Sequence, residues 1–133
     1  MQDFKNLKVW TKAHQLTLAV YRQTRTFPAD EKYELTSQFR RATVSIAANI
    51  AEGSSRESQA DFRRFLEIAL GSLSETQYYL ILSRDLDYLK LVDHEHLDRL
   101  MTEIRKMLAA FIIRLRPPAR LARNKPSGSS ENC

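Results

Sequence analysis

Cysteine is almost absent from this sequence of 133 residues, since the only one is the last residue, Cys133. A single terminal cysteine excludes an internal disulfide and any metal site built from several thiolates. The stability of the fold must therefore come from the packing of side chains.

Long apolar runs are also absent. The longest, residues 107–113, is far shorter than the roughly 18 residues that a membrane span requires, and Met1 to Trp10 contains no stretch typical of a signal peptide. Only 3 glycines and 4 prolines interrupt the chain. We expect one globular domain in the cytosol, with no membrane partner.

An excess of acidic residues is lacking too, because 21 Lys and Arg against 16 Asp and Glu give a net charge of +5. Residues 1–26 hold five basic and one acidic group, and residues 93–133 hold eight and five, whereas the middle has a net charge of −2. Basic ends favour contact with phosphate backbones, although a solvated helix face produces the same pattern.

The apolar residues recur every three or four positions, which is typical of amphipathic helices, and no segment alternates as a half-buried strand does. We expect helices over residues 7–26, 35–52, 58–86 and 94–116, with Gly53 after the second helix and with Ser58 and Asp93 as N-caps. Short connections predict an all-α, up-down-up-down antiparallel four-helix bundle over residues 1–116. Residues 117–133 have too little apolar surface to fold and are expected to form a disordered basic tail.

Two segments, residues 78–82 and 107–113, are apolar around the whole helix circumference. One inward stripe cannot bury both, so they favour a homo-oligomer whose interfaces include Ile81 or Ile112. Scattered exposed apolar side chains on a monomer are the alternative.

The sequence offers little for catalysis or metal binding. Its histidines, His14, His94 and His96, have no Glu three positions before them, and no serine lies in a Gly-x-Ser-x-Gly turn. We expect no metal, no cofactor and no enzymatic activity.

A polar line runs beside the core stripe of the second expected helix. Helical spacing aligns Arg41, Ser45, Asn49 and Glu52, and antiparallel folding brings this helix near Ser72 and Glu75 of the third. We interpret these six residues as a structural hydrogen-bond network, in which antiparallel folding would allow Arg41 to contact Glu75. A small-anion site that uses Arg40 or Arg41 is the alternative.

The segments FPADEKYELT, SQFRRATVSIAANIAEGSSRES and RRFLEIALGSLSET resemble the bacterial 23S rRNA intervening-sequence proteins over about residues 4–115. The sequence departs from the family pattern at Glu34 and Asp87, where glycine is usual. The resemblance implies a four-helix bundle that assembles into a ring, typically a pentamer, and a relation to the accessory protein of diversity-generating retroelements. Some members are encoded within segments that interrupt 23S rRNA genes, which implies binding to nucleic acid.

We therefore expect a protein that binds RNA or DNA with little sequence specificity, through cations that neutralise phosphates. The expected contacts are Lys5, Lys8, Lys12, Arg22, Arg25, Arg40, Arg63 and Arg64, with Arg120, Arg123 and Lys125 of the tail in addition. An oligomeric adaptor for another protein, such as a nucleic-acid enzyme, is the second hypothesis, with Trp10 or Tyr78 as anchors. An enzyme that uses Arg40, Arg41 and Glu75 around a small anion is the third.

Overall fold

The computed structural model describes residues 3–118, and all the regular secondary structure in this part of the chain is helical, with no strand. Short 3₁₀ turns, Phe4–Asn6 and Ala29–Glu31, precede α1 and α2. The four long helices are α1 (Lys8–Thr24), α2 (Leu35–Ser54), α3 (Gln59–Asp85) and α4 (Leu91–Arg114). Most of the expected tail, with Arg120, Arg123 and Lys125, lies outside the described residues.

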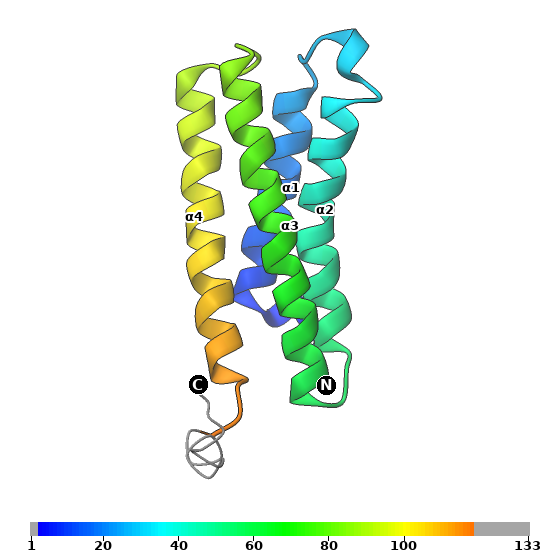
Figure 1. Cartoon of the computed structure of the whole chain (residues 1–133), viewed down its shortest axis with the longest axis vertical. Coiled ribbons are helices and arrows are strands. Elements are labelled where there is room, and N and C mark those ends of the chain that lie inside the picture. Colours follow the sequence, from blue (N-terminus) through cyan, green and yellow to red (C-terminus); the bar gives the residue numbers. More distant parts are fainter. Residues whose placement is uncertain (1–2, 119–133) are drawn as a thin grey trace, which may run out of the picture.

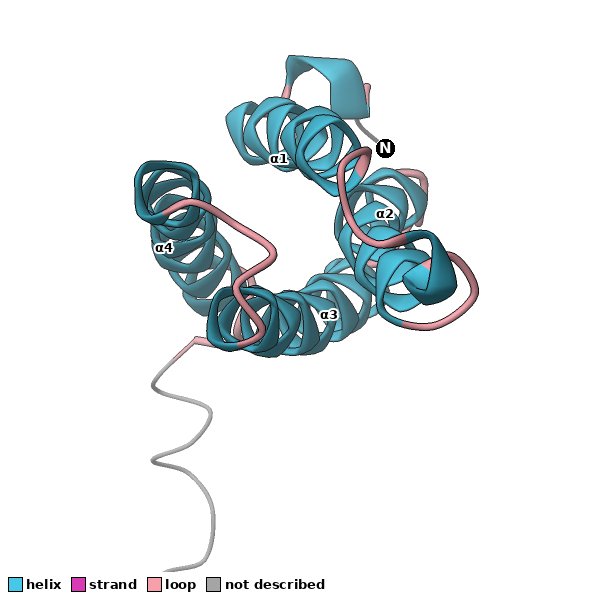
Figure 2. Ribbon diagram, turned by 90° about the horizontal axis from the view of Figure 1, so that it is seen from above, coloured by secondary structure: helices cyan, strands magenta, loops and turns pink. Residues whose placement is uncertain are grey.

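The four helices lie along one axis, and consecutive helices run in opposite directions (Figure 1). Each helix packs against two neighbours, so that α1 contacts α2 and α4, and α3 contacts the same two helices (Figure 2). This arrangement confirms the predicted four-helix bundle. It places the start of α1 and the end of α4 at one end of the bundle, and the turn between α1 and α2 at the other.

The core lies along the bundle axis and is built from the predicted stripes. Each helix contributes fully buried side chains, among them Leu16, Ile46, Leu73 and Ile104, all 0% exposed. Their burial stabilises the fold by about 25 cal/mol for each Å² of apolar surface removed from water. This is the main stabilising contribution in a bundle without disulfides.

The observed helices match the predicted ranges to within three residues at each end, but two residues that were expected to mark helix ends have other roles. Gly53 lies inside α2, which continues to Ser54, and an added Cβ there would lie 2.7 Å from Phe65 Cβ. The glycine is thus required by the close approach of α3, and the interpretation of Gly53 as a helix terminator is wrong. Asp93 is likewise not the N-cap of α4, because the helix begins at Leu91, and its carboxylate lies in the first turn, where the helix dipole favours a negative charge.

The other expected cap is confirmed, since Ser58 Oγ accepts a hydrogen bond of 3.0 Å from the Asp61 amide at the start of α3. In the turn between α3 and α4, Asp87 has a φ of 61°. Glycine adopts this left-handed conformation most easily, and Asp is among the residues that tolerate it. Glu34, the second departure from the family pattern, has a φ of −115°.

The two apolar runs do not lie wholly on the surface. Ile112 is 4% exposed and Leu80 is 1% exposed, so both belong to the core. Of the two residues expected in an interface between subunits, Ile81 or Ile112, burial argues against Ile112, because α4 turns this side chain toward the bundle axis. Tyr78, Ile81 and Ile113 remain exposed, at 56%, 43% and 60%. Within residues 3–118, no helix is apolar over the length needed to cross a bilayer.

Candidate nucleic-acid interface

Two adjoining grooves lie where α1 ends and α2 begins, with volumes of about 460 and 370 Å³. Both are lined by Lys32, Thr36 and Arg40. The first is also lined by Tyr21, Tyr33, Ser37, Arg41 and Val44, and the second by Thr24, Arg25, Phe27, Pro28 and Ala29. We call the two together the Tyr33 groove.

Arg40 is held in place by α1. Its Nε donates to Thr24 Oγ1 at 2.8 Å, its Nη2 donates to the Tyr21 carbonyl at 3.3 Å, and its guanidinium lies 4.6 Å from the centre of the Tyr21 ring. Thr24 is itself buried and donates to the Val20 carbonyl at 2.8 Å. These contacts fix the guanidinium as a flat, charged surface above Tyr21.

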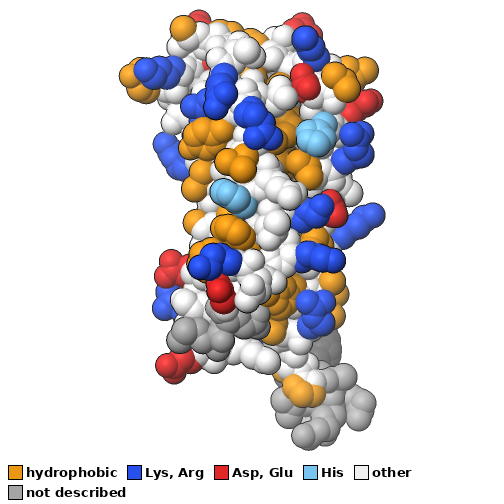
Figure 3. Space-filling view, turned by 180° about the vertical axis from the view of Figure 1, so that it is seen from behind, with side chains coloured by type: hydrophobic (Ala, Val, Ile, Leu, Met, Phe, Trp, Pro, Cys, Tyr) orange, Lys and Arg blue, Asp and Glu red, His pale blue; other side chains and the backbone are white. Residues whose placement is uncertain are grey.

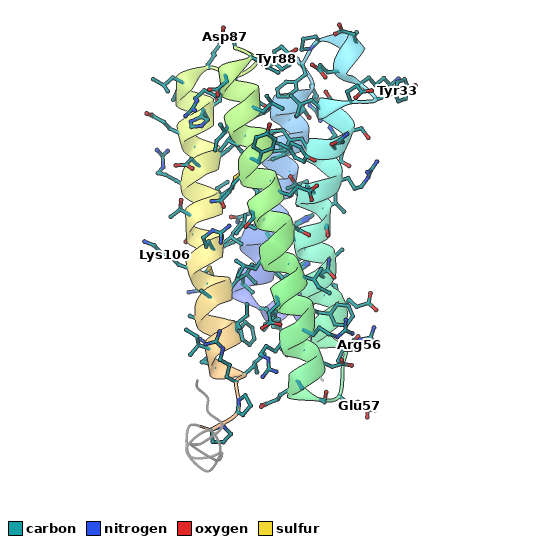
Figure 4. The ribbon with its side chains drawn as sticks, in the orientation of Figure 1. Tyr33, Arg56, Glu57, Asp87, Tyr88 and Lys106 are labelled. Atoms are coloured by element: carbon teal, nitrogen blue, oxygen red, sulfur yellow. The ribbon has the colours of Figure 1, made fainter. Side chains whose placement is uncertain are left out.

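Tyr33 lies in the turn before α2 and is 81% exposed, the highest value among the large hydrophobic residues described. Figure 4 shows its side chain projecting away from the bundle. Lys32 Nζ lies 5.4 Å from the ring centre, within the range of a cation–π interaction. An aromatic ring and the cation over it are thus both exposed to solvent.

The turn that carries Tyr33 is fixed by Glu31. One carboxylate oxygen accepts from the Leu35 amide at 3.2 Å, and the other accepts from the Tyr88 hydroxyl at 2.8 Å. The hydrogen bond to the Glu31 carboxylate raises the pKa of Tyr88, because the proton is held between the two groups. Phe27 packs against Tyr88 with a centroid separation of 5.3 Å. The turn is therefore tied to the connection between α3 and α4.

The charge of the Tyr33 groove is of one sign. Its four cations are Arg25, Lys32, Arg40 and Arg41, and no Asp or Glu lines either part of it. The nearby Glu31 and Glu34 instead line a separate groove with Tyr79 and Leu86. Figure 3, which views the bundle from behind Figure 1, shows Lys and Arg side chains beside exposed hydrophobic ones at this end of the molecule.

The eight cations predicted as nucleic-acid contacts do not form one patch. Arg22, Arg25 and Arg40 lie at the end of the bundle that carries the groove, whereas Lys5, Lys8, Arg63 and Arg64 lie at the opposite end. The 17 residues of α1 separate the two groups by about 25 Å.

Besides Arg40, three of the predicted cations are engaged within the chain. Lys12 Nζ is 3.5 Å from Glu103, Arg63 donates to the Leu115 carbonyl at 3.2 Å, and Arg64 is 3.4 Å from Asp61. The predicted nucleic-acid contacts did not include Lys32, Tyr21 and Tyr33, and Arg41 was assigned to the polar line or, as the alternative, to a small-anion site. The sequence signal that could have identified this end of the bundle is the pair Lys32-Tyr33, a cation next to an aromatic ring in an expected turn.

The predicted polar line forms two separate clusters between α2 and α3. In the first, Ser45 Oγ and Ser72 Oγ are 2.8 Å apart, and Asn49 Nδ2 donates to Ser45 Oγ at 3.0 Å and to its carbonyl at 2.8 Å. All three residues are half-buried. These bonds satisfy polar groups at the helix contact and fix the register of α2 against α3.

The second cluster centres on Tyr79, whose hydroxyl lies 2.9 Å from Gln38 Oε1 and 3.1 Å from Glu75 Oε2. Partial burial is the main cause that raises the pKa of Tyr79, and the hydrogen-bonded Glu75 carboxylate raises it further. Gln38, Glu75 and Tyr79 line a small pocket together with Arg41. No ion pair within 4.0 Å joins Arg41 to Glu75 in residues 3–118. Arg41 and Glu75 are exposed.

Glu52, the remaining member of the predicted line, is also exposed and pairs with Arg56 at 2.6 Å. It is therefore separate from both clusters. Among residues 3–118, no group of three or more His, Cys, Asp or Glu side chains is arranged to hold a metal ion.

Comparison with known proteins gives two findings. Residues 5–110 match the family described as 23S rRNA-intervening sequence protein. The fold is similar to the crystal structure of a protein of unknown function from the S23 ribosomal protein family of Bacteroides thetaiotaomicron VPI-5482, with a TM-score of 0.73 and 30% sequence identity. That similarity covers 78% of this chain and 94% of the other. None of the curated proteins matches the sequence.

Proposed function

The chain belongs to the family of 23S rRNA-intervening sequence proteins, and we propose that it binds RNA or DNA through the Tyr33 groove, without catalysing a reaction. The name of the family mentions 23S rRNA, so RNA is the first ligand to test for this chain. Binding would have little sequence specificity, because Arg and Lys contacts to phosphates carry no information about the bases.

The observation that carries this proposal is the set of four cations, Arg25, Lys32, Arg40 and Arg41, in a groove lined by no carboxylate. A nucleic-acid backbone supplies a row of negative charges, and each phosphate that a cation neutralises releases condensed counterions. Exposed ion pairs elsewhere on the surface, such as Arg64 with Asp61, contribute less to phosphate binding, because their charges already compensate each other.

Salt is expected to weaken binding strongly. Four neutralised phosphates give a slope of about −3 for log affinity against log salt on a single strand, so raising salt from about 50 to about 200 mM should lower affinity about 50-fold. Fluorescence anisotropy with labelled RNA and DNA at several salt concentrations measures the slope. Affinity that does not change with salt would reject the phosphate mechanism, and no binding at low salt would reject the function.

A matched pair of double variants locates the binding. Arg25→Gln with Lys32→Gln removes two groove cations and should reduce the salt slope by about half. Arg99→Gln with Lys106→Gln removes the same charge from exposed positions on α4 that do not line the groove. Figure 4 shows Lys106 on the side of the bundle opposite to Tyr33. Equal effects of the two double variants would show that net charge, and not the groove, attracts the nucleic acid.

We also propose that the chain assembles into a homo-oligomer, and the five-subunit ring implied by the family resemblance is the expected form. The exposed apolar residues of α3 support this proposal, since Ile68, Tyr78 and Ile81 are 42%, 56% and 43% exposed. An interface over this helix would remove them from water.

Ile81→Glu is expected to break the assembly into smaller species, because a desolvated charge costs several kcal/mol at every repeat of the interface. Light scattering at micromolar concentration measures the mass, and Thr102→Glu, which adds a charge at an exposed polar position of α4, is the control. A monomeric parent would reject the assembly.

A further inference from the structure

We propose that the Tyr33 groove binds an unpaired segment of nucleic acid, with one base stacked on the Tyr33 ring. This inference rests on the proposed function and adds that the bound strand is single-stranded. It follows from how the groove combines aromatic rings with cations, which differs from a surface that carries charge alone.

The Tyr33 ring is an open platform. It is 81% exposed, and Lys32 Nζ lies over it, 5.4 Å from the ring centre. The turn beneath it is held by the two hydrogen bonds of Glu31, so the backbone loses little conformational entropy when a ligand binds to the ring. A base that stacks there would cover apolar surface that the chain leaves in water.

A second flat surface borders the groove, where the Arg40 guanidinium covers the Tyr21 ring at 4.6 Å. Guanidinium planes and aromatic rings both accept stacked bases in complexes with single-stranded RNA. The Arg40 side chain is already fixed by Thr24 and by the Tyr21 carbonyl. The groove therefore offers a stacking surface on Tyr33 and a charged plane on Arg40.

The cations are placed to follow a backbone beside these surfaces. Arg25 lines one part of the groove and Arg41 lines the other, with Lys32 and Arg40 common to both. A charged channel with aromatic platforms is the arrangement by which proteins bind single strands without reading their sequence. In a duplex the base faces are stacked on one another, so a duplex would use the cations but not Tyr33.

The experiment compares unpaired and paired strands of one sequence. The parent is titrated with a labelled 12-nucleotide RNA, the same sequence as DNA, and each strand annealed to its complement. We expect unpaired strands to bind about tenfold more tightly than duplexes, and Tyr33→Ala to remove that difference while leaving duplex binding unchanged. Tyr33→Phe, which keeps the ring, should bind as the parent does.

A spectroscopic signal tests the stacking itself. A 2-aminopurine base in the unpaired strand should be quenched on binding the parent and Tyr33→Phe, and should stay bright with Tyr33→Ala. Leu91→Ala is the control, since it shortens a side chain that is 66% exposed at the start of α4. The RNA and DNA arms should both show quenching, because both strands present the same base faces.

The outcomes separate this inference from the proposed function. Equal affinity for paired and unpaired strands, or full quenching with Tyr33→Ala, would overturn the stacking and leave the phosphate mechanism standing. No binding of any strand at low salt would overturn both. A change in oligomeric mass on Tyr33→Ala would instead make the groove an interface between copies of the chain, which also overturns the inference.

Discussion

Replacing Ile112 by Glu is expected to unfold the bundle, with a loss of more than about 3 kcal/mol in the free energy of unfolding. Ile112 is 4% exposed and belongs to the continuous core formed by all four helices. A carboxylate at this position would be removed from water, and the apolar side chains around it offer no partner. Circular dichroism during urea or thermal unfolding measures the effect.

The neighbouring residue provides the matched control. Ile113 is 60% exposed, because one step along a helix turns a side chain by about 100°, and Ile113→Glu should change the stability of a single chain by less than about 0.5 kcal/mol. A result in which Ile112→Glu melts like the parent but forms smaller assemblies would place Ile112 in an interface, as the sequence alone had suggested.

The architecture was predictable because helical periodicity records which side chains face the core. The stripe of Val9, Ala13, Leu16 and Val20 is buried in α1, and the other three helices follow the same rule. Periodicity loses this resolution where a helix is apolar all around, as in residues 107–113. Every side chain there satisfies the pattern, so Ile112 and Ile113 could not be told apart without the packing.

Helix ends were less predictable, since the residues that end helices have more than one use. Glycine is common just after a helix and is also common where two helices approach closely, and only the position of Phe62 and Phe65 shows that Gly53 serves the second purpose. Asp is favoured both at the N-cap and in the first turn, so Asp93 indicated the start of α4 to within a few residues.

The Tyr33 groove was only partly visible in the sequence. Charge identified Arg25 and Arg40 as candidates, but the groove depends on contacts between residues far apart in the chain, such as Arg40 with Tyr21 and Thr24. The exposure of Tyr33 is also a tertiary property, since an aromatic residue in a turn packs into the core as readily as it faces solvent. In this chain Phe27 is buried by the same connection that leaves Tyr33 in water.

Gly53→Ala is expected to lower the free energy of unfolding by about 1 to 3 kcal/mol, although alanine is the better helix former. The new Cβ would lie 2.7 Å from Phe65 Cβ, 3.0 Å from Phe62 Cδ1 and 3.3 Å from the Phe62 carbonyl oxygen. A Cβ and a backbone oxygen cannot swing away as the end of a flexible side chain can. The strain must therefore be relieved by moving α2 away from α3, which loosens the core around Phe62 and Leu66.

Gly71→Ala, in the middle of α3, is the matched substitution and should act in the opposite direction. A Cβ at Gly71 meets nothing within 4 Å, so alanine should raise the free energy of unfolding by about 0.4 to 1 kcal/mol. Urea unfolding of both variants at one protein concentration measures the pair. If Gly53→Ala leaves the free energy of unfolding unchanged, α2 and α3 move apart at little energetic cost. A destabilising Gly71→Ala would mean that another copy of the chain occupies the space beside Gly71, because this chain leaves it open.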